Sequence, residues 1–402
     1  MDEALQIIRA KCAVIDARRI PLKESHRRIL RENVLAKEDA PPFDRSAMDG
    51  FAVRMNDPSG QFSVVDEIRA GAWKPRSLQV GQAVRIYTGA PLPCADLTVL
   101  MQEDVAVEGE TMRPRAHSRS AERNIRFQGE DARRGALLVP AGRRLDAGEI
   151  AILASAGYAH PLVSRAPLIL HYVTGDELAA PDAALAPGQI RDCNSAIMRA
   201  LLANDGLDVE AGRLPEDYER SLGCLRADLE STADALLISG GASVGAHDYT
   251  RRLLEALGFE IHFTQVRVRP GKPLIFATRG AQMAFGIPGN PLAHFVCHPL
   301  FIRTALNRMQ GLNSVPRFFN GFLADPLECE PGPRETFWPA RLELARRGFT
   351  LHALRWESSG DITVLNGVQA LMRVPPDTGP QPAGAEISFL PLHWPGDSPQ
   401  SP

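Results

Sequence analysis

Several turns of this chain combine glycine or proline with charged residues, a combination suited to holding an anion. The clearest are TGDEL at 174–178, SGGASVG at 239–245, RPGKP at 269–273 and GIPGNP at 286–291. Each follows a short apolar run that predicts a β-strand. In an open α/β sheet, ligands bind beyond the carboxyl ends of the strands. We therefore expect these turns to converge on one pocket at one edge of a sheet.

The glycine-rich turn 239–245 is a candidate phosphate cradle, because residues without a Cβ atom let backbone N–H groups approach an anion closely. Its expected ligand contacts are Ser239, Gly240, Gly241, Ser243 and Gly245. A tight strand-to-helix turn is the alternative, since the segment matches neither a Walker motif nor GxGxxG. Lys272, held on a stiff turn between Gly271 and Pro273, and nearby Arg269 favour the anion site. A merely solvated basic pair is the alternative for these two cations.

Carboxylates are expected around the same edge: Asp176, Glu177, Asp192 and Asp248. They would repel a phosphate unless a cation intervened, so the mixture predicts a hard divalent ion, most simply Mg²⁺. Asp192 and Asp248 are the candidate metal ligands. Helix capping is the alternative for both, because Asp248 could cap the helix that follows it and Asp192 the helix after Asn194.

Two other chemistries are disfavoured by the sequence. His294, Cys297 and His298 stand at i, i+3 and i+4 of a predicted helix, a spacing that superficially suits zinc. No second ligand cluster stands at matching spacing, so we expect half-buried packing for these side chains. Ser239 and Ser243 have no convincing His and Asp partners in the sequence, and a serine-hydrolase triad is not supported.

A helix-flanked parallel sheet must position these turns. From residue 167 to 309, apolar runs alternate with helical patterns at 195–204, 217–230 and 249–257 and after 291. Residues 51–127 instead show short β-like runs between Gly and Pro turns, typical of a small β-domain. In the outer segments we expect a helix over 2–17, a helical turn over 26–30 and a helix over 150–156. Asp146 can cap the last of these helices, and we expect it to pack back on the first helix. A late hairpin is expected to turn at Arg347 and Gly348.

Composition excludes several classes of protein. The chain has 402 residues, 44% of them apolar and 23% charged, which is ordinary globular composition and predicts more than one domain. A net charge of −3 provides no global field for nucleic acid or an anionic membrane. We see no membrane span and no signal peptide, so we expect a cytoplasmic protein. The six cysteines form no CxxC pair, which favours reduced, structural thiols.

The motifs also resemble a known family, the molybdopterin molybdenumtransferases, or MoeA family, to which the E domain of gephyrin belongs. The resemblance rests on PPFDRSAMDGFAV at 41–53, TGAPLP at 88–93, GED at 129–131, TGDEL at 174–178, GQIRDCNS at 188–195, SGGASVGAHDYT at 239–250, RPGKP at 269–273 and GIPGNP at 286–291. The order is that of the family, and the last 90 or so residues match least clearly. A non-catalytic carrier or scaffold of the same family remains the alternative, whereas a Rossmann dehydrogenase is disfavoured because GxGxxG is missing.

The resemblance implies a homodimer whose protomer combines α/β and β domains in four parts. These are a discontinuous N-terminal domain at 1–41 and 128–165, an inserted β-domain at 42–127, a molybdopterin-binding α/β domain at 166–312 and a C-terminal β-barrel domain at 313–402. It also implies the reaction: molybdate enters adenylylated molybdopterin with Mg²⁺ or a similar ion, and AMP is released. The implied candidate partners are the molybdopterin adenylyltransferase and acceptor apo-enzymes.

The resemblance assigns site residues by motif position. Across the dimer cleft these are Asp49, Thr88 and Asp131, and within the α/β domain they are Glu177, Asp192, Asp248, Lys272, Pro288 and Pro291. Arg269, Arg45 and Ala293 depart from the family, which often has lysine, asparagine and serine there. Ser358, Ser359 and Arg334 are weak candidates in the divergent C-terminal segment. The sequence does not distinguish molybdate from tungstate.

Overall fold

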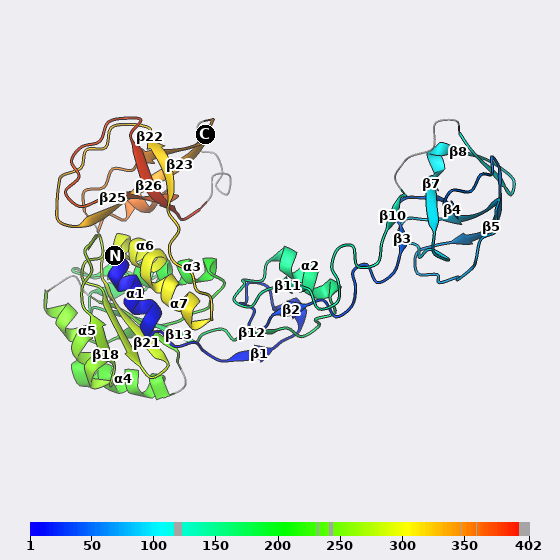
Figure 1. The fold of residues 1–402 in the computed structure, drawn as a ribbon. Helices are drawn as coiled ribbons and strands as arrows, with labels where there is room; N and C mark the ends of the chain where they lie inside the picture. The colour runs from blue at the N-terminus through cyan, green and yellow to red at the C-terminus, as the bar shows by residue number, and fades with distance from the viewer. Residues whose placement is uncertain (116–122, 231–232, 241–243, 347, 359, 394–402) are drawn as a thin grey trace. The chain divides into compact units, whose positions relative to one another are not determined.

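The computed structural model describes residues 1–115, 123–230, 233–240, 244–346, 348–358 and 360–393. The chain folds into two compact units, which Figure 1 draws with the colours of the chain. The first unit comprises Met1–Arg18, Arg27–Arg31 and Leu162–Pro402, and the second comprises Arg19–His26 and Glu32–Pro161. The finer four-part division expected from the family remains a prediction.

A six-stranded sheet with the order β16-β13-β17-β21-β20-β18 forms the centre of the first unit. Its strands are β13 (Ile169–Thr174), β16 (Glu210–Leu214), β17 (Ala235–Gly240), β18 (Glu260–Phe263), β20 (Ile275–Arg279) and β21 (Gln282–Pro288). Strands β16, β13, β17 and β21 are mutually parallel, as predicted. Strand β20 is antiparallel to β21, because a short turn through Gly280, with φ +59°, joins the two strands.

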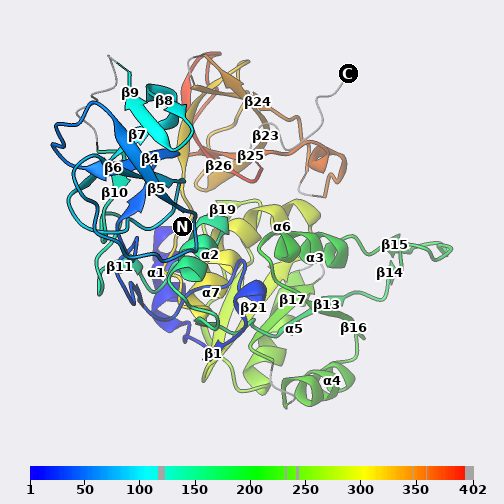
Figure 2. The ribbon, with the colours of Figure 1, turned by 90° about the vertical axis from the view of Figure 1, so that its right-hand side faces the viewer.

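Helices cover both faces of this sheet (Figure 2). On one face, α4 (Tyr218–Glu230) and α5 (Val244–Ala256) enclose a core of leucines that includes Leu225 and Leu253. On the other face lie α1 (Asp2–Lys11), α3 (Asn194–Asn204), α6 (Pro291–Cys297), the π-helical turn η3 (His298–Ile302) and α7 (Arg303–Met309). None of the helices in the described ranges is both long and apolar enough to cross a membrane.

The predicted first helix is shorter than expected. Helix α1 ends at Lys11, and Cys12 adopts extended backbone with φ −70° and ψ 119°. Two β-branched residues follow, and the N–H of Ile15 donates to the carbonyl of Met309 in α7, which favours an extended chain over another helical turn. The expected helical turn at 26–30 is also wrong, since Leu30 forms a β-bridge with Val163 instead.

The C-terminal strands close into a barrel. They are β22 (Phe319–Leu323), β23 (Glu335–Ala345), β24 (Gly348–Ala353), β25 (Ala370–Val374) and β26 (Glu386–Pro391), with η4 (Thr363–Leu365) before β25. The ring closes because β23 pairs with both β24 and β25. The predicted hairpin is confirmed by β23 and β24, although Arg347 lies outside the described residues. The smaller elements of this unit are β12 (Leu162–Ser164), β14 (Leu178–Ala179), β15 (Ile190–Arg191) and β19 (Val268–Arg269).

The second unit is built on a curled six-stranded sheet with the order β7-β4-β6-β5-β9-β8. Its strands are β4 (Gly50–Arg54), β5 (Phe62–Ile68), β6 (Gln82–Ile86), β7 (Leu97–Met101), β8 (Val105–Glu108) and β9 (Thr111–Pro114). Gly50 is required where β4 meets β7, since a Cβ atom there would lie 2.0 Å from the carbonyl oxygen of Leu100. The sheet therefore fixes the end of the PPFDRSAMDG motif.

The remaining elements of the chain are short. They are β1 (Ala17–Arg19), η1 (Leu22–Glu24), β2 (Val34–Leu35), β3 (Arg45–Ser46), η2 (Gln102–Asp104), β10 (Ile125–Arg126), β11 (Leu137–Val139) and α2 (Ala147–Ser155). Asp146 caps α2 in a capping box with Glu149, as the sequence predicts. Helix α1 belongs to the first unit and α2 to the second, so the expected packing of α2 on the first helix stays a prediction.

Candidate active-site residues

The sheet of the first unit brings the predicted turns to one edge. Strands β13, β17 and β21 end at Thr174, Gly240 and Pro288, where Gly240 pairs with Pro288. Strand β20 runs the opposite way, and its Ile275 pairs with Gly286 near the end of β21. The RPGKP turn therefore reaches the same edge by preceding β20, whereas the strand it follows, β19, pairs with β23 of the barrel and not with this sheet.

The start of the glycine-rich turn is tightly packed. A Cβ atom on Gly240 would lie 3.3 Å from the hydroxyl oxygens of both Thr174 and Thr250. Gly241 and Ser243 lie outside the described residues, and Gly245 belongs to α5, which begins five residues earlier than predicted. A role of this turn in phosphate binding stays a prediction.

Ser239 has two histidine partners that no sequence motif predicts. Its Oγ lies 2.8 Å from Nε2 of His171 and 2.7 Å from Nε2 of His294. The one available signal is His171 itself, the polar residue in the otherwise apolar run LILHYV. Packing is confirmed for three side chains that were expected to be half-buried, but the structure buries them completely. They are His294, Cys297 and His298.

The carboxylates at this edge have separate structural contacts. Asp192 Oδ1 accepts a hydrogen bond of 3.0 Å from the N–H of Ser195 in the first turn of α3, so the capping alternative is observed. Asp248 is exposed inside α5 and does not cap it, because that helix begins at Val244. The carboxylate of Glu177 folds back over Gly175, where a Cβ atom would lie 2.6 Å from Oε2.

The GIPGNP turn is joined to α3 and starts α6. The side-chain amide of Asn194 donates to the carbonyl of Gly289 over 2.8 Å. Asn290 is the N-cap residue of α6, and Pro291 occupies the first turn, where a missing N–H costs nothing. Ala293 is buried in the apolar core beneath the turn.

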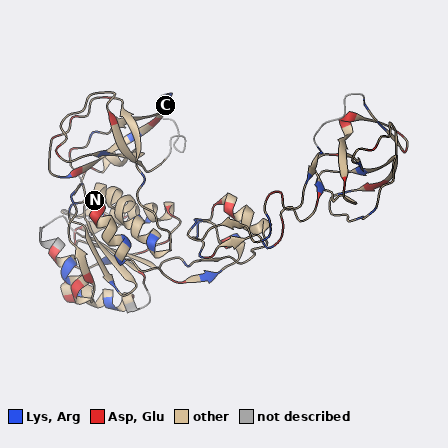
Figure 3. Ribbon diagram, in the orientation of Figure 1, with Lys and Arg blue, Asp and Glu red and all other residues tan. Residues whose placement is uncertain are grey.

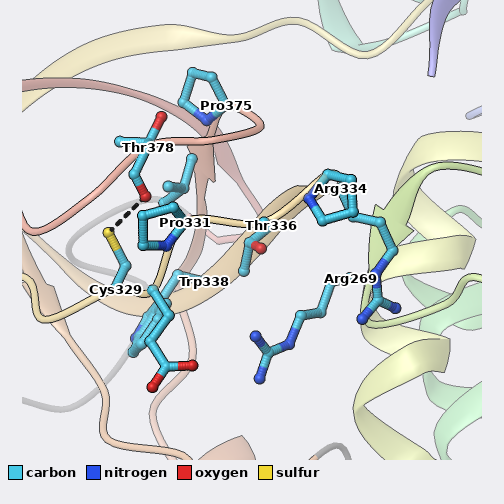
Figure 4. Close-up of a pocket in the computed structure, with 12 residues that line it drawn as sticks. Arg269, Cys329, Pro331, Arg334, Thr336, Trp338, Pro375 and Thr378 are labelled. Carbon is cyan, nitrogen blue, oxygen red and sulfur yellow. Dashed lines mark hydrogen bonds between the residues drawn. The ribbon is translucent and has the colours of Figure 1, made fainter.

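The two cations of the RPGKP turn line different pockets, and Arg334 lines both. The guanidinium carbon of Arg269 lies 5.3 Å from the ring centre of Trp356, which in turn contacts Trp338 edge-on. Figure 4 shows Arg269 beside Arg334 in a pocket lined mainly by residues of the barrel. Lys272 is exposed and lines a groove of about 670 Å³ with Arg334 and α1. Among the described residues, no carboxylate forms an ion pair with Arg269, Lys272 or Arg334.

Lys272 and Asp248 lie near helices that cover different faces of the sheet. The groove that Lys272 lines is bordered by α1, which covers one face, whereas Asp248 lies on α5, which covers the other. Both signs of charge are present on α4 and α5 (Figure 3). No three His, Cys, Asp or Glu side chains in the described part of the chain are grouped so that they could hold a metal ion. Convergence of these residues on one ligand therefore stays a prediction.

In the second unit, Asp49 and Thr88 are brought together directly. Asp49 Oδ1 accepts hydrogen bonds of 2.7 Å from both the N–H and the hydroxyl of Thr88. The backbone bond and then the hydroxyl bond lower the pKa of Asp49 below its usual range. Asp131 instead forms an ion pair with Arg126. The structure thus links Asp49 to Thr88 and holds Asp131 in a separate contact.

Thr88→Val is expected to raise the pKa of Asp49 toward its usual value, because valine lacks the donating hydroxyl. In the native chain the ionised Asp49 carboxylate stabilises the folded unit at any pH above the usual aspartate pKa. This stabilisation is lost as the pH falls through the lowered pKa that Asp49 has in the folded chain. NMR titration of the Asp49 carboxyl carbon measures the shift. Thr98→Val is the matched control, and an unchanged Asp49 titration in Thr88→Val would contradict the assignment.

Comparison with known proteins agrees with this architecture. A family model described as "MoeA N-terminal region (domain I and II)" matches residues 1–157, and one described as "Probable molybdopterin binding domain" matches residues 171–308. A molybdopterin molybdenumtransferase of Staphylococcus epidermidis is 30% identical over 397 residues, covering 96% of this chain and 94% of that protein. The chain belongs to the MoeA family. It is therefore an enzyme of the molybdopterin molybdenumtransferase type, with a role in molybdenum-cofactor biosynthesis.

Other members of the family extend the comparison. A molybdopterin molybdenumtransferase of Nostoc is 35% identical over 373 residues, covering 90% of this chain and 85% of that protein. The crystal structure of the molybdopterin biosynthesis moeA protein from Pyrococcus horikoshii OT3 superposes with a TM-score of 0.80 at 25% identity, covering 97% of this chain and 99% of that one. The MoeA fold thus extends over the C-terminal barrel, where the sequence motifs are weakest.

Proposed function

We propose that this chain inserts molybdate into adenylylated molybdopterin and releases AMP. The observation that carries the proposal is the set of cations Arg269, Lys272 and Arg334, which have no carboxylate partner in the described residues. Molybdate and a pyrophosphate are both anions, and bringing them together costs Coulomb energy that such cations offset. Membership in a family of molybdopterin molybdenumtransferases supports this choice of substrate.

Each part of the sheet edge has a distinct role in this proposal. Lys272 and Arg269 attract the anionic groups, and the residues around Ser239 and Gly240 present backbone to the phosphates. Pro288 and Pro291 hold the GIPGNP turn, since proline removes backbone freedom at both ends of it. The carboxylates act by positioning a metal ion rather than as nucleophiles.

We propose Mg²⁺ as the ion between these carboxylates and the ligand. Carboxylate oxygens are the donors that Mg²⁺ prefers, and the ion keeps few protein ligands when phosphate oxygens supply the rest. Asp192 fits such a role with the oxygen that does not cap α3, and Asp248 fits through its exposed carboxylate. The ion would neutralise charge between the phosphates and the acidic residues Glu177, Asp192 and Asp248.

We also propose that the chain works as a homodimer. Asp49, Thr88 and Asp131 belong to the second unit, away in sequence from the α/β residues. The family relationship supports a contribution of these residues to the site of a partner subunit. It also supports the proposed division into four domains, at 1–41 with 128–165, 42–127, 166–312 and 313–402. Sedimentation equilibrium measures the oligomeric state, and a monomer at assay concentrations would contradict the arrangement.

Release of AMP tests the proposed reaction. The purified chain is mixed with adenylylated molybdopterin, MgCl₂ and molybdate, and AMP is quantified by chromatography. Molybdate-dependent AMP release in each turnover is expected. A carrier or scaffold would bind adenylylated molybdopterin and release no AMP, so binding without turnover would favour that alternative. Parallel reactions with tungstate measure oxyanion preference.

Asp248→Asn is expected to increase the Mg²⁺ concentration needed for half-maximal turnover several-fold while leaving the fold intact, because the exposed carboxylate lies inside α5 and does not cap it. Asp192→Asn tests the second ligand and keeps an oxygen that can accept from Ser195, so the helix cap is retained. A magnesium titration of the turnover rate is the measurement. Asp228→Asn on α4 is the control, and a wild-type magnesium response would remove Asp248 from the site.

A further inference from the structure

Three polar side chains share one hydrogen-bonded centre inside the core of the first unit. His171 comes from β13, Ser239 from the end of β17 and His294 from α6. All three are at most 2% exposed. The Ser239 hydroxyl lies within 2.8 Å of Nε2 of both imidazoles, and Nδ1 of His294 lies 3.1 Å from the carbonyl oxygen of Asn290. We call this group the His-Ser-His cluster.

The contacts determine where each proton lies. A carbonyl oxygen only accepts, so Nδ1 of His294 carries the proton that bonds Asn290. Burial lowers the pKa of His294 to about 4 and that of His171 to about 3, so both rings are neutral near pH 7. Nε2 of His294 therefore accepts the proton of the Ser239 hydroxyl. Nε2 of His171 must then donate to the same oxygen, and its Nδ1 is left as a buried acceptor without a hydrogen-bond partner in the described residues.

The surroundings explain why this cluster has one arrangement. Ala235 and Leu237 precede Ser239 on the same face of β17 and pack in the apolar core. In such a core an unsatisfied hydroxyl or imidazole N–H is costly, so each available donor keeps its partner. The side chain at the start of the glycine-rich turn is consequently restrained from two directions.

Helix α6 extends the restraint to two further turns. Its N-cap Asn290 belongs to GIPGNP and accepts from His294. Its last residue, Cys297, lies against the RPGKP turn, since a Cβ atom on Gly271 would be 2.7 Å from the Cys297 sulfur. The cluster thus connects β13, the beginning of the glycine-rich turn and the helix on which both proline-rich turns rest.

We propose that His171 and His294 are positioning residues which, through the Ser239 hydroxyl, hold the start of the glycine-rich turn against GIPGNP in the orientation that the anionic ligand requires. The proposal rests on the proposed function for the identity of that ligand. Neither imidazole touches the ligand, because both are enclosed by protein. The expected signature is a change in substrate affinity rather than in the rate of the chemical step.

The proton assignment can be tested without any ligand. In protein labelled with ¹⁵N-histidine, two-bond ¹H–¹⁵N spectra at pH 7 distinguish the two neutral tautomers of each ring. His171 is expected to carry its proton on Nε2 and His294 on Nδ1, with His171→Gln and His294→Gln identifying the signals. A His294 proton on Nε2, or a charged ring at either position, would overturn the arrangement.

Steady-state kinetics test the positioning role. His171→Leu, His294→Leu and Ser239→Ala are each expected to raise KM for adenylylated molybdopterin about fivefold while kcat changes little, as for the indirect loss of one well-placed contact. Glutamine can donate or accept at the same reach, so His171→Gln and His294→Gln should restore KM to near the native value. Tyr172→Phe is the matched control, because Tyr172 is next on β13 but packs on the opposite face and bonds Asp228.

The outcomes separate the two proposals. A native KM in the folded leucine variants, or a Tyr172→Phe variant with the same KM increase, would overturn the positioning role. If the leucine variants do not fold, the glutamine variants decide. The expected tautomers in the native chain, together with a native KM in both glutamine variants, support the positioning role. A raised KM in both glutamine variants counts against the positioning role. If the native chain shows no AMP release, the proposed reaction fails. The tautomer spectra then decide by themselves whether the His-Ser-His cluster has the proposed hydrogen-bonded arrangement.

Discussion

Lys272→Ala is expected to weaken the binding of adenylylated molybdopterin about 10- to 150-fold, the loss of about 1.5 to 3 kcal/mol that follows from removing a charge-assisted contact. The side chain is exposed and has no carboxylate partner in the described residues, so its charge is available to a ligand. The fold should survive, because the turn is held by the Lys272 carbonyl, which accepts from the N–H groups of Val266 and Leu274.

Isothermal titration calorimetry measures this effect. Lys23→Ala, which removes an exposed lysine of the second unit, is the control for a simple loss of positive charge. Lys272→Arg should recover part of the affinity, since the charge remains while its geometry changes from a compact ammonium to a planar fork. The loss should shrink at high ionic strength, where exposed charges are screened. Equal affinities of Lys272→Ala and the native chain would remove Lys272 from the site.

Gly271→Ala is expected to lower the free energy of unfolding of the first unit by about 2 to 4 kcal/mol, combining backbone strain with overpacking. Gly271 has φ +108°, a conformation that residues with a Cβ atom rarely adopt. The added methyl group would also lie 2.7 Å from the sulfur of fully buried Cys297. Either the turn or α6 must shift, and Lys272 is the next residue in the chain.

Thermal and urea unfolding measure the effect, and two further variants divide it. Gly109→Ala places a methyl group at another positive φ of +64° with no atom within 4 Å, so it reports backbone strain alone. Cys297→Ala in the Gly271→Ala background removes the sulfur and should recover the overpacking part. Stability of Gly271→Ala equal to that of the native chain would show that the turn tolerates a side chain.

Local sequence patterns predicted the elements whose determinants are close together. The capping box of Asp146 and Glu149 starts α2 as expected, Pro291 begins α6, and β23 pairs with β24 as the predicted hairpin. These features depend on interactions within a few residues. The family motifs likewise indicated the α/β plus β fold, because each is a short contiguous string.

Long-range contacts decided the rest. The end of α1 depends on Met309 in α7, and the direction of β20 depends on how it pairs with β21. Asp192 was an ambiguous carboxylate until the position of Ser195 showed it to be a helix cap. Lys272 lines a groove beside α1 and Asp248 lies on α5, which follows from which helix covers which side of the sheet.

From its motifs alone the chain can be assigned to its family and fold class, and its charged turns can be predicted to lie at the rim of a sheet. Which side chains meet at this rim depends on tertiary contacts, since His171 and His294 are 68 and 55 residues from the serine they share. Composition and spacing indicate which charged, polar and glycine residues each segment contributes. The pairing of distant segments is set by packing across the whole core, where burial makes a single hydrogen-bonded arrangement favourable.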